Sequence, residues 1–207
     1  MKSDFIIQCI DNITNCIVES ESEIESLDRV IGDGDHYINI KRGALAVQSI
    51  KGDLNHLTNA EAFKKIGMTI MSSVGGASGP LFASFFLALS KEVSDNDDLH
   101  KFSLGFSRGV ESIMQRGKSK LGDKTMLDVL IPVSEKLQSL VKDGCEKNIM
   151  IKEIDLTAQA GVIATKDLIP AKGRSAGLAE RAVGHIDPGA KTCQIIISTI
   201  CNQLNKG

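Results

Sequence analysis

Residues 5–17 read FIIQCIDNITNCI, and the spacing of their apolar side chains decides the fold class. Apolar residues recur there at i, i+4 and i+7 or i+8, which places them on one stripe of an α-helix. Similar spacing recurs along almost the whole chain, whereas convincing period-2 alternation between turn pairs is absent. The sequence therefore predicts an all-α protein.

The apolar pattern predicts eight helices in one bundle. The stretch LFASFFLAL, residues 81–89, is apolar nearly all round, so its helix is expected to be the most buried. No repeat, low-complexity tract or linker divides the 207 residues, so 1–207 is expected to form a single domain. The expected helices span residues 3–27, 36–51, 59–73, 79–92, 99–116, 125–142, 149–168 and 189–205.

Composition excludes several classes of protein. With 42% hydrophobic and 24% charged residues, the chain is neither disordered nor fibrous in character. A net charge of −2 leaves no electrostatic footprint for nucleic acid or for an anionic membrane. The N-terminus lacks a signal-type apolar core, and the longest apolar stretch is too short to span a bilayer, so a cytoplasmic protein is expected.

The connections between the expected helices differ by parity. Those after the second, fourth and sixth helices are short and generic. Consecutive helices of an up-and-down bundle run antiparallel, so all odd-numbered connections should meet at one end. Glycine-rich loops at helix N-termini offer N–H groups to phosphate, so this end is predicted to bind anions and metal. The odd-numbered connections are DRVIGDGD (28–35), SSVGGASG (72–79), RGKSKLGDKT (116–125) and IPAKGRSAGLAERAVGHIDPG (169–189).

The first odd-numbered connection places Asp28, Asp33 and Asp35 within eight residues. Gly32 and Gly34 relax the backbone between them, so the carboxylates can converge on Mg²⁺, which prefers a few carboxylates plus waters and phosphate oxygens. The alternative is an acidic turn followed by a helix cap at Asp35. An EF-hand is excluded by register, because isoleucine falls where that loop needs glycine.

The other odd-numbered connections carry weaker signals. Residues 72–80 are rich in small side chains, which is consistent with either a ligand-binding loop or a tight connection between two helices. Residues 117–119 imitate the end of a phosphate-binding P-loop, but serine stands at 112 where that motif needs glycine. The long last connection is expected to be structureless and functional, with Arg174 and Arg181 as candidate phosphate or partner contacts. Asp187 is a candidate cap for the last helix.

Four segments resemble the signatures of the nucleotide-binding (L) subunit of dihydroxyacetone kinase, the DhaL family. They are LDRVIGDGDH (27–36), MSSVGGASGPLF (71–82), RGKSKLGDKTM (116–126) and KGRSAGLAERAVGHIDPGA (172–190). The resemblance covers essentially the whole chain and follows the family order. It implies an eight-helix antiparallel barrel with ADP or ATP bound at one end through two Mg²⁺ ions.

The resemblance also implies which residues form the site. Asp28, Asp33 and Asp35 would ligate the Mg²⁺ ions, and no catalytic residue is expected beyond this clamp on metal and phosphate. The residues implied to surround the nucleotide are His36, Tyr37, Ile38, Asn39, Ser72, Ser73, Gly75, Gly76, Gly117, Met126, Arg174, Asp187, Pro188 and Gly189.

The resemblance further implies two protein partners. Dihydroxyacetone, or a related ketose, is expected on a separate K subunit, and a phosphotransferase-system protein is expected to rephosphorylate the bound ADP. A homodimer is left open. Two other functions also stay open, a Mg²⁺-dependent phosphatase and an ADP-sensing regulatory module.

Two departures from the family pattern stand out. Tyr37 stands where glycine is usual, and Gly177-Leu178-Ala179 with Ala182 replace a more usual Tyr-Leu-Gly and Ser. The first departure is a candidate to alter the nucleotide pocket. The second is a candidate to alter the partner surface or the substrate.

Overall fold

The computed structural model describes residues 3–96 and 98–206, and within these ranges the regular structure is helical. No described helix combines the length and apolar character needed to cross a membrane. The α-helices are α1 (Ser3–Glu19), α2 (Glu21–Ile31), α3 (His36–Ser49), α4 (Lys51–Leu54), α5 (Asn59–Ser73), α6 (Ser78–Glu92), α7 (Leu99–Gly117), α8 (Leu127–Lys142), α9 (Lys147–Ala164) and α10 (Pro188–Leu204). Two 3₁₀-helices are η1 (Thr165–Asp167) and η2 (Arg174–Ala182).

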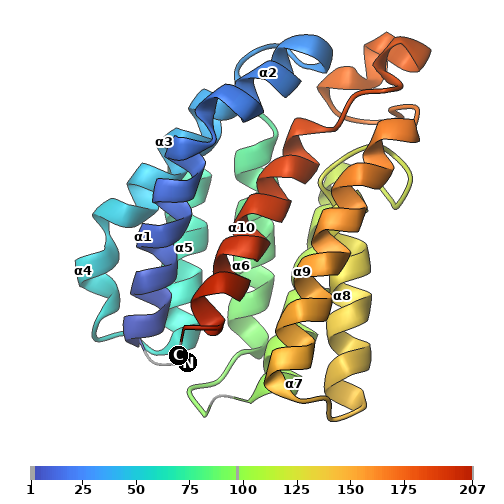
Figure 1. Ribbon diagram of the computed structural model, residues 1–207. Coiled ribbons are helices and arrows are strands. Elements are labelled where there is room, and N and C mark those ends of the chain that lie inside the picture. Colours follow the sequence, from blue (N-terminus) through green and yellow to red (C-terminus); the bar gives the residue numbers. More distant parts are fainter. Residues whose placement is uncertain (1–2, 97, 207) are drawn as a thin grey trace.

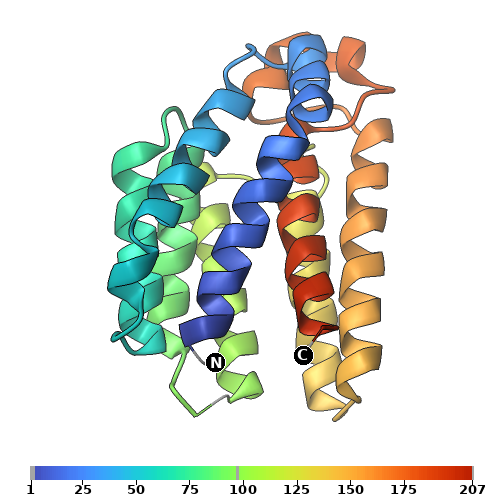
Figure 2. The ribbon, with the colours of Figure 1, turned by 60° about the vertical axis from the view of Figure 1, so that its left-hand side comes forward.

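The long helices run up and down around a common interior, as the parity of the connections predicts. Figure 1 shows α2, η2 and the α2–α3, α5–α6 and α7–α8 connections at the upper end, while the α6–α7 and α8–α9 connections lie at the lower end. Figure 2 shows both termini at the lower end as well. Four segments spread over the whole sequence therefore share one end of the barrel.

The predicted helix 3–27 is wrong in one respect, because the chain breaks at Ser20. Ser20 has φ −87° and ψ 11°, and its side chain makes no capping hydrogen bond within the described structure. The second piece, α2, continues to Ile31 and tilts over the upper end of the barrel (Figure 1). Asp28 consequently lies in a helix and not in the loop that the sequence predicted.

Capping side chains set where several helices begin. Thr58 and Glu61 form a capping box at the start of α5: the Thr58 hydroxyl accepts from the Glu61 amide, and the Glu61 carboxylate accepts from the Thr58 amide. Asp98 accepts from the Lys101 amide at 3.1 Å at the start of α7. These local contacts explain why the predicted starts at 59 and 99 are accurate.

Helix α6 is not the most buried helix, contrary to the expectation from LFASFFLAL. Its buried residues are Gly79, Ala83, Phe85 and Leu89, whereas α8 and α10 each bury nine. The reason is that several α6 side chains, including Phe82 and Phe86, line an apolar cavity of about 250 Å³ inside the barrel. These side chains pack against the core on one side and face the cavity on the other, so they are only partly buried.

The long connection 169–189 is not structureless. Residues Arg174–Ala182 form η2, which is interrupted at Ala179, where φ is 46°. Ser175 and Ala182 are buried, so this segment is packed onto the upper end of the barrel. The expectation of a structureless loop is therefore corrected.

Close contact between α8 and α9 requires glycine at 161. A Cβ atom there would lie 2.6 Å from the Asp128 carbonyl oxygen and 3.0 Å from the Val129 Cα, both backbone atoms that cannot move aside cheaply. The α8–α9 pair carries the segments that form half of the upper end. Its spacing is thus fixed by one missing side chain.

We predict that Gly161→Ala lowers the free energy of unfolding by about 1–3 kcal/mol, because the methyl group overpacks a backbone contact. Gly52→Ala is the matched control, since a Cβ there meets nothing within 4 Å. Helix propensity should leave the control's stability unchanged or raised by up to about 1 kcal/mol. Urea unfolding of both variants measures the difference, and equal midpoints would contradict the close-packing argument.

Candidate functional site

The carboxylate of Asp28 is buried in α2 and holds the start of α3. Its Oδ2 accepts a hydrogen bond from the His36 amide at 3.0 Å. Gly32 makes room for this side chain, because a Cβ there would fall 1.8 Å from Asp28 Oδ1. The capping bond of α3 is thus supplied from eight residues upstream.

Asp35 occupies the cap position of α3 but makes no capping hydrogen bond in the described structure. The pKa of Asp35 is raised, first by burial and then by the hydrogen bond and the charge of neighbouring Asp33. Arg174 of η2 lies against this pair, with its Nε 2.9 Å from Asp33 Oδ2. The two carboxylates are therefore close together and free of a helix-capping role, which disfavours the simple acidic-turn alternative.

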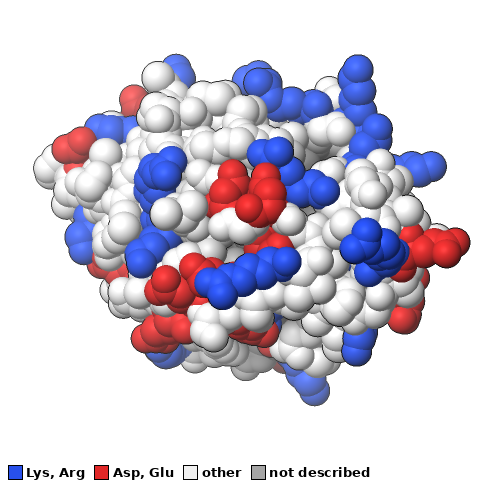
Figure 3. Space-filling view, turned by 90° about the horizontal axis from the view of Figure 1, so that it is seen from above, with Lys and Arg blue, Asp and Glu red and all other residues white. Residues whose placement is uncertain are grey.

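The acidic pair faces outward at the upper end. Figure 3 looks down on this end and shows acidic side chains at the centre of the face, with lysines and arginines around them. Asp33 and Arg174 are exposed over 39% and 60% of their side chains, so their ion pair is accessible and exchangeable. Such a face attracts a cation at its centre and anionic groups at its rim.

The described residues include no ready-made group of three His, Cys, Asp or Glu side chains that holds a metal ion. Asp28 is engaged by the His36 amide and Asp33 by Arg174. The donors nevertheless suit a hard dication, since they are all carboxylate oxygens and two of them repel each other. Mg²⁺ keeps several waters and phosphate oxygens, so it does not need a complete cage of protein ligands.

The small-residue loop 74–78 lies against both α3 and Arg174. A Cβ at Gly75 would fall 2.5 Å from the Oδ1 of buried Asn39, and one at Gly76 would lie 3.8 Å from Arg174 Nη2. The loop backbone thus approaches the acidic pair from the α5–α6 side. The hydroxyls of Ser72 and Ser73 donate to the Thr69 carbonyl of their own helix, at 3.0 and 2.6 Å, and so do not reach the carboxylates.

The start of α10 forms the other half of the site. Asp187 caps this helix, as predicted: its Oδ2 accepts from the Ala190 amide at 2.7 Å, with Pro188 at the first position. A Cβ at Gly189 would lie 3.7 Å from the Cβ and the amide nitrogen of Met126, so these two predicted residues are neighbours. The last two signature segments therefore meet here.

One histidine joins the two halves. The ring Nε2 of His36 lies 2.9 Å from the Thr192 hydroxyl, which donates to the Pro188 carbonyl at 3.0 Å. Burial of the ring lowers the pKa of His36, so the neutral imidazole is favoured. A continuous set of contacts therefore links Asp28 of α2 to the Pro188 segment of α10.

Lys124 is a residue whose role the sequence did not reveal. Lysine side chains are rarely buried, yet that of Lys124 is fully buried. Its ammonium group donates to the carbonyls of Thr165 and His185, the latter at 2.6 Å. Burial lowers the pKa of Lys124, while the charges of Asp187 and Asp128 raise it. Lys124 thus ties the last connection to the end of α9.

Asp128 orders the turn that carries Lys124. Its two carboxylate oxygens accept from the amides of Gly122 and Thr125, at 2.6 and 2.7 Å. Asp128 itself is buried, so these bonds are needed to satisfy its charge. The sequence signal for this arrangement is Gly122-Asp123-Lys124-Thr125 shortly before Asp128. Such a spacing is typical of a tight turn whose backbone amides donate to a nearby aspartate side chain.

Three predicted site residues remain less tightly connected to this cluster. The Tyr37 side chain is buried in a small core cluster away from the upper face, so only its backbone is available to a ligand there. Ile38 is 57% exposed. Gly117 ends α7, and the left-handed Lys118 that follows, with φ 49°, turns the chain towards Lys124.

Comparisons with known proteins identify the family of the chain. Residues 30–202 match the model of the DAK2 domain. The chain is 38% identical over 197 residues to the PTS-dependent dihydroxyacetone kinase, ADP-binding subunit DhaL, of Lactococcus lactis, covering 95% of each chain. It is 34% identical over 198 residues to the PEP-dependent dihydroxyacetone kinase, ADP-binding subunit DhaL, of Escherichia coli, covering 93% of this chain and 94% of that one.

A solved structure has the same fold. The crystal structure of the dihydroxyacetone kinase from C. freundii in complex with AMP-PNP and Mg²⁺ superposes with a TM-score of 0.71 at 25% identity. The match covers 95% of this chain but 33% of that protein, so the present chain corresponds to about a third of the larger kinase.

Asp187 should make stability depend on pH. Burial is the main cause that raises its pKa from 3.8 to about 7, so the folded state holds a proton that the unfolded state releases. Between about pH 4 and 7 the free energy of unfolding should therefore fall as pH rises, by roughly 1–3 kcal/mol. Asp187→Asn keeps a capping side chain and should flatten this slope. Urea unfolding of wild type and variant at pH 5 and 7.5 measures it, and identical slopes would contradict the assignment.

Proposed function

The chain belongs to the DAK2 domain family, and on that premise we propose that it is the ADP-binding subunit of a dihydroxyacetone kinase served by a phosphotransferase-system donor. The observation that carries this proposal is the pair Asp33 and Asp35, two adjacent carboxylates without a capping role at a phosphate-suited end of the barrel. The names of relatives at 34–38% identity, matched over more than nine-tenths of their length, support the kinase assignment.

Asp28, Asp33 and Asp35 are proposed to hold Mg²⁺, which neutralises phosphate charge and orients the phosphoryl group when bound. Arg174 now offsets the charge of Asp33 at 2.9 Å. With Mg²⁺ bound, the charge of Asp33 would be offset by the ion, and the exposed guanidinium of Arg174 would be available to a phosphate oxygen. Arg174 would thus pair with either Asp33 or the nucleotide.

The remaining residues are proposed to position the nucleotide. The loop containing Gly75 and Gly76 presents backbone N–H groups beside Arg174. The N-terminus of α10 presents a positive dipole end next to Met126. Phosphoryl transfer needs mainly such positioning and charge neutralisation, so no nucleophile is required from this chain.

The proposed partners follow from what the relatives are called. Two relatives are named PTS-dependent and PEP-dependent dihydroxyacetone kinase subunits, which supports a phosphotransferase-system protein as donor. The ketose is proposed to sit on a separate K subunit that docks over the upper face. The match to about a third of the C. freundii kinase leaves room in that larger protein for such a second part.

We predict that Asp33→Asn and Asp35→Asn each weaken Mg²⁺-dependent ADP binding by at least about ten-fold, because a charged metal ligand is lost. The stability of the ligand-free protein should not fall, since each change relieves repulsion between the two carboxylates. Asp53→Asn, at an exposed ion pair with Lys65, is the control. Calorimetry with ADP and Mg²⁺ measures the affinity, and unchanged binding in both site variants would refute the metal assignment.

We also predict that this chain alone does not phosphorylate dihydroxyacetone with ATP and Mg²⁺. The proposed ketose site lies on another protein, so activity should appear when a K subunit is added. A coupled assay with and without that subunit is the test, and clear ketose phosphorylation by the chain alone would overturn the two-subunit proposal. Hydrolysis of phosphoesters by the chain alone would instead favour a phosphatase.

A further inference from the structure

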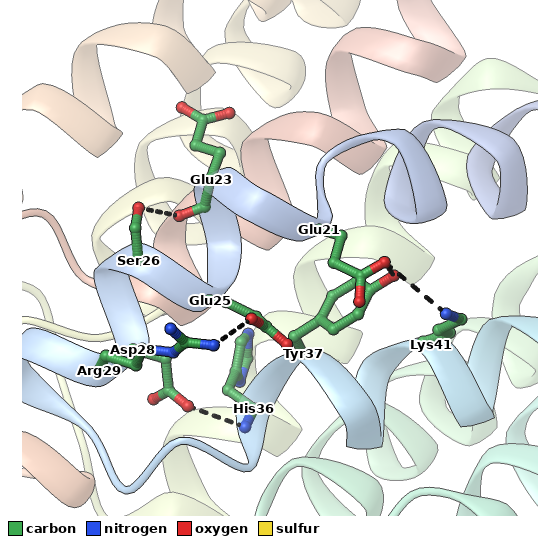
Figure 4. Close-up of polar contacts among 9 residues, drawn as sticks. All are labelled: Glu21, Glu23, Glu25, Ser26, Asp28, Arg29, His36, Tyr37 and Lys41. Carbon is green, nitrogen blue, oxygen red and sulfur yellow. Dashed lines mark hydrogen bonds and ion pairs between the residues drawn. The ribbon is translucent and has the colours of Figure 1, made fainter.

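We propose that Tyr37 is a positioning residue that holds α2, and with it Asp28, over the upper end of the barrel. The expected effect on Mg²⁺ binding rests on the proposed function. The expected effect on the position of α2 does not. The departure from the family pattern suggested that Tyr37 alters the nucleotide pocket. Its side chain does not enter that end of the barrel. It runs beneath the start of α2 (Figure 4).

Helix α2 depends on tertiary contacts for its position. It has 11 residues, which is too short for a helix to be stable alone in water. It follows the break at Ser20, whose side chain supplies no cap in the described structure. Its buried residues are Ile24, Asp28 and Ile31, so the middle of its buried stripe is a carboxylate and not an apolar group.

Two consecutive residues of α3 hold the two ends of α2. The His36 amide donates to Asp28 Oδ2 at 3.0 Å near the C-terminal end. The Tyr37 hydroxyl donates to Glu21 Oε2 at 3.0 Å at the first residue of α2. Figure 4 shows both contacts reaching from the start of α3 to α2. On the α10 side, Lys191 Nζ lies 2.9 Å from Glu23 Oε1.

The surroundings of Tyr37 fix where its hydroxyl points. Its ring is 3% exposed and packs in one cluster with four isoleucines from α1, α2, α3 and α10, which are Ile17, Ile24, Ile40 and Ile195. Lys41 Nζ lies 5.3 Å from the ring centroid and 3.9 Å from Glu21 Oε2. The hydroxyl is therefore held against Glu21 Oε2, to which it donates.

The consequence concerns the metal end. With both ends held by α3, helix α2 cannot turn about its axis without breaking the Glu21 or the Asp28 contact. With the Tyr37 hydroxyl removed, the exposed Lys41–Glu21 pair remains at 3.9 Å, and the Asp28 contact is the buried hydrogen bond that still ties α2 to the start of α3. The proposed ligand carboxylate then becomes the point about which α2 turns. A glycine at position 37 would supply neither the ring nor the hydroxyl.

Two measurements on Tyr37→Phe test the proposal, because this variant keeps the packed ring and removes the hydroxyl. Amide hydrogen exchange in residues 21–31 of the ligand-free protein should accelerate about two- to ten-fold, the equilibrium effect of one hydrogen bond, while α8 stays unchanged. The Mg²⁺ concentration that half-saturates ADP binding should rise by a similar factor. A merely structural loss would accelerate exchange throughout and leave the Mg²⁺ dependence unchanged.

Variants of Glu21 and Glu25 provide the rescue and the control. Glu21→Ala should reproduce Tyr37→Phe, and the double variant should be no worse than either single one. Glu21→Gln keeps an acceptor oxygen for the hydroxyl and should retain most of the Mg²⁺ affinity. Glu25→Ala removes an acidic side chain of the same helix that pairs with Arg29 and should change neither measurement.

The outcomes separate this inference from the proposed function. Unchanged exchange in α2 of Tyr37→Phe overturns the positioning role, whatever the nucleotide data show. Faster exchange in α2 with an unchanged Mg²⁺ dependence overturns the link to Asp28. Wild-type protein that does not bind ADP with Mg²⁺ overturns the proposed function, and the exchange data then still decide whether Tyr37 holds α2.

Discussion

The hydrogen bond from the His36 amide to the buried carboxylate of Asp28 is the contact on which the upper end of the barrel depends. A helix start needs an acceptor for its free amides, and the residue at the cap position usually supplies it. Here Asp28 supplies it from the preceding helix, so Asp35 at the cap position is released for another role. The cap supplied by Asp28 therefore leaves the neighbouring pair Asp33 and Asp35 available for the candidate metal site.

The helical architecture could be predicted from the sequence because it depends on two features, the spacing of apolar residues and the parity of the connections. Neither feature depends on how individual side chains pack. The break at Ser20 could not be predicted, because Ile17, Ile24 and Ile31 are seven residues apart and give the same pattern in one straight helix or two bent ones. The burial of α6 was overestimated for a different reason. A helix that faces an interior cavity has the same apolar surface as one that is close-packed.

Site residues could be predicted where the residues that act together are close in sequence. They could not be predicted where a side chain contacts residues that are distant in sequence. Asp33 and Asp35 lie two residues apart and are close together in the structure, whereas Asp28, which was expected to converge with them, accepts from the His36 amide. The role of Lys124 depends on the carbonyls of Thr165 and His185, which lie 41 and 61 residues away in sequence. No pattern within the 116–126 segment carries that information, so the sequence gives no reason to single out Lys124 from the other lysines of the segment.

Arg174 and Lys124 show two different uses of positive charge at the same end of the barrel. Lys124 is fully buried, and removing a buried charge from its partners costs far more than an exposed ion pair contributes. It is therefore a fixed part of the structure. Arg174 is 60% exposed and pairs with one carboxylate of a repelling pair, so its contact is weak and exchangeable. The proposed site for a dication and a nucleotide phosphate needs this second kind of contact, because an exposed arginine can change partners whereas the buried lysine holds the surrounding loop in place.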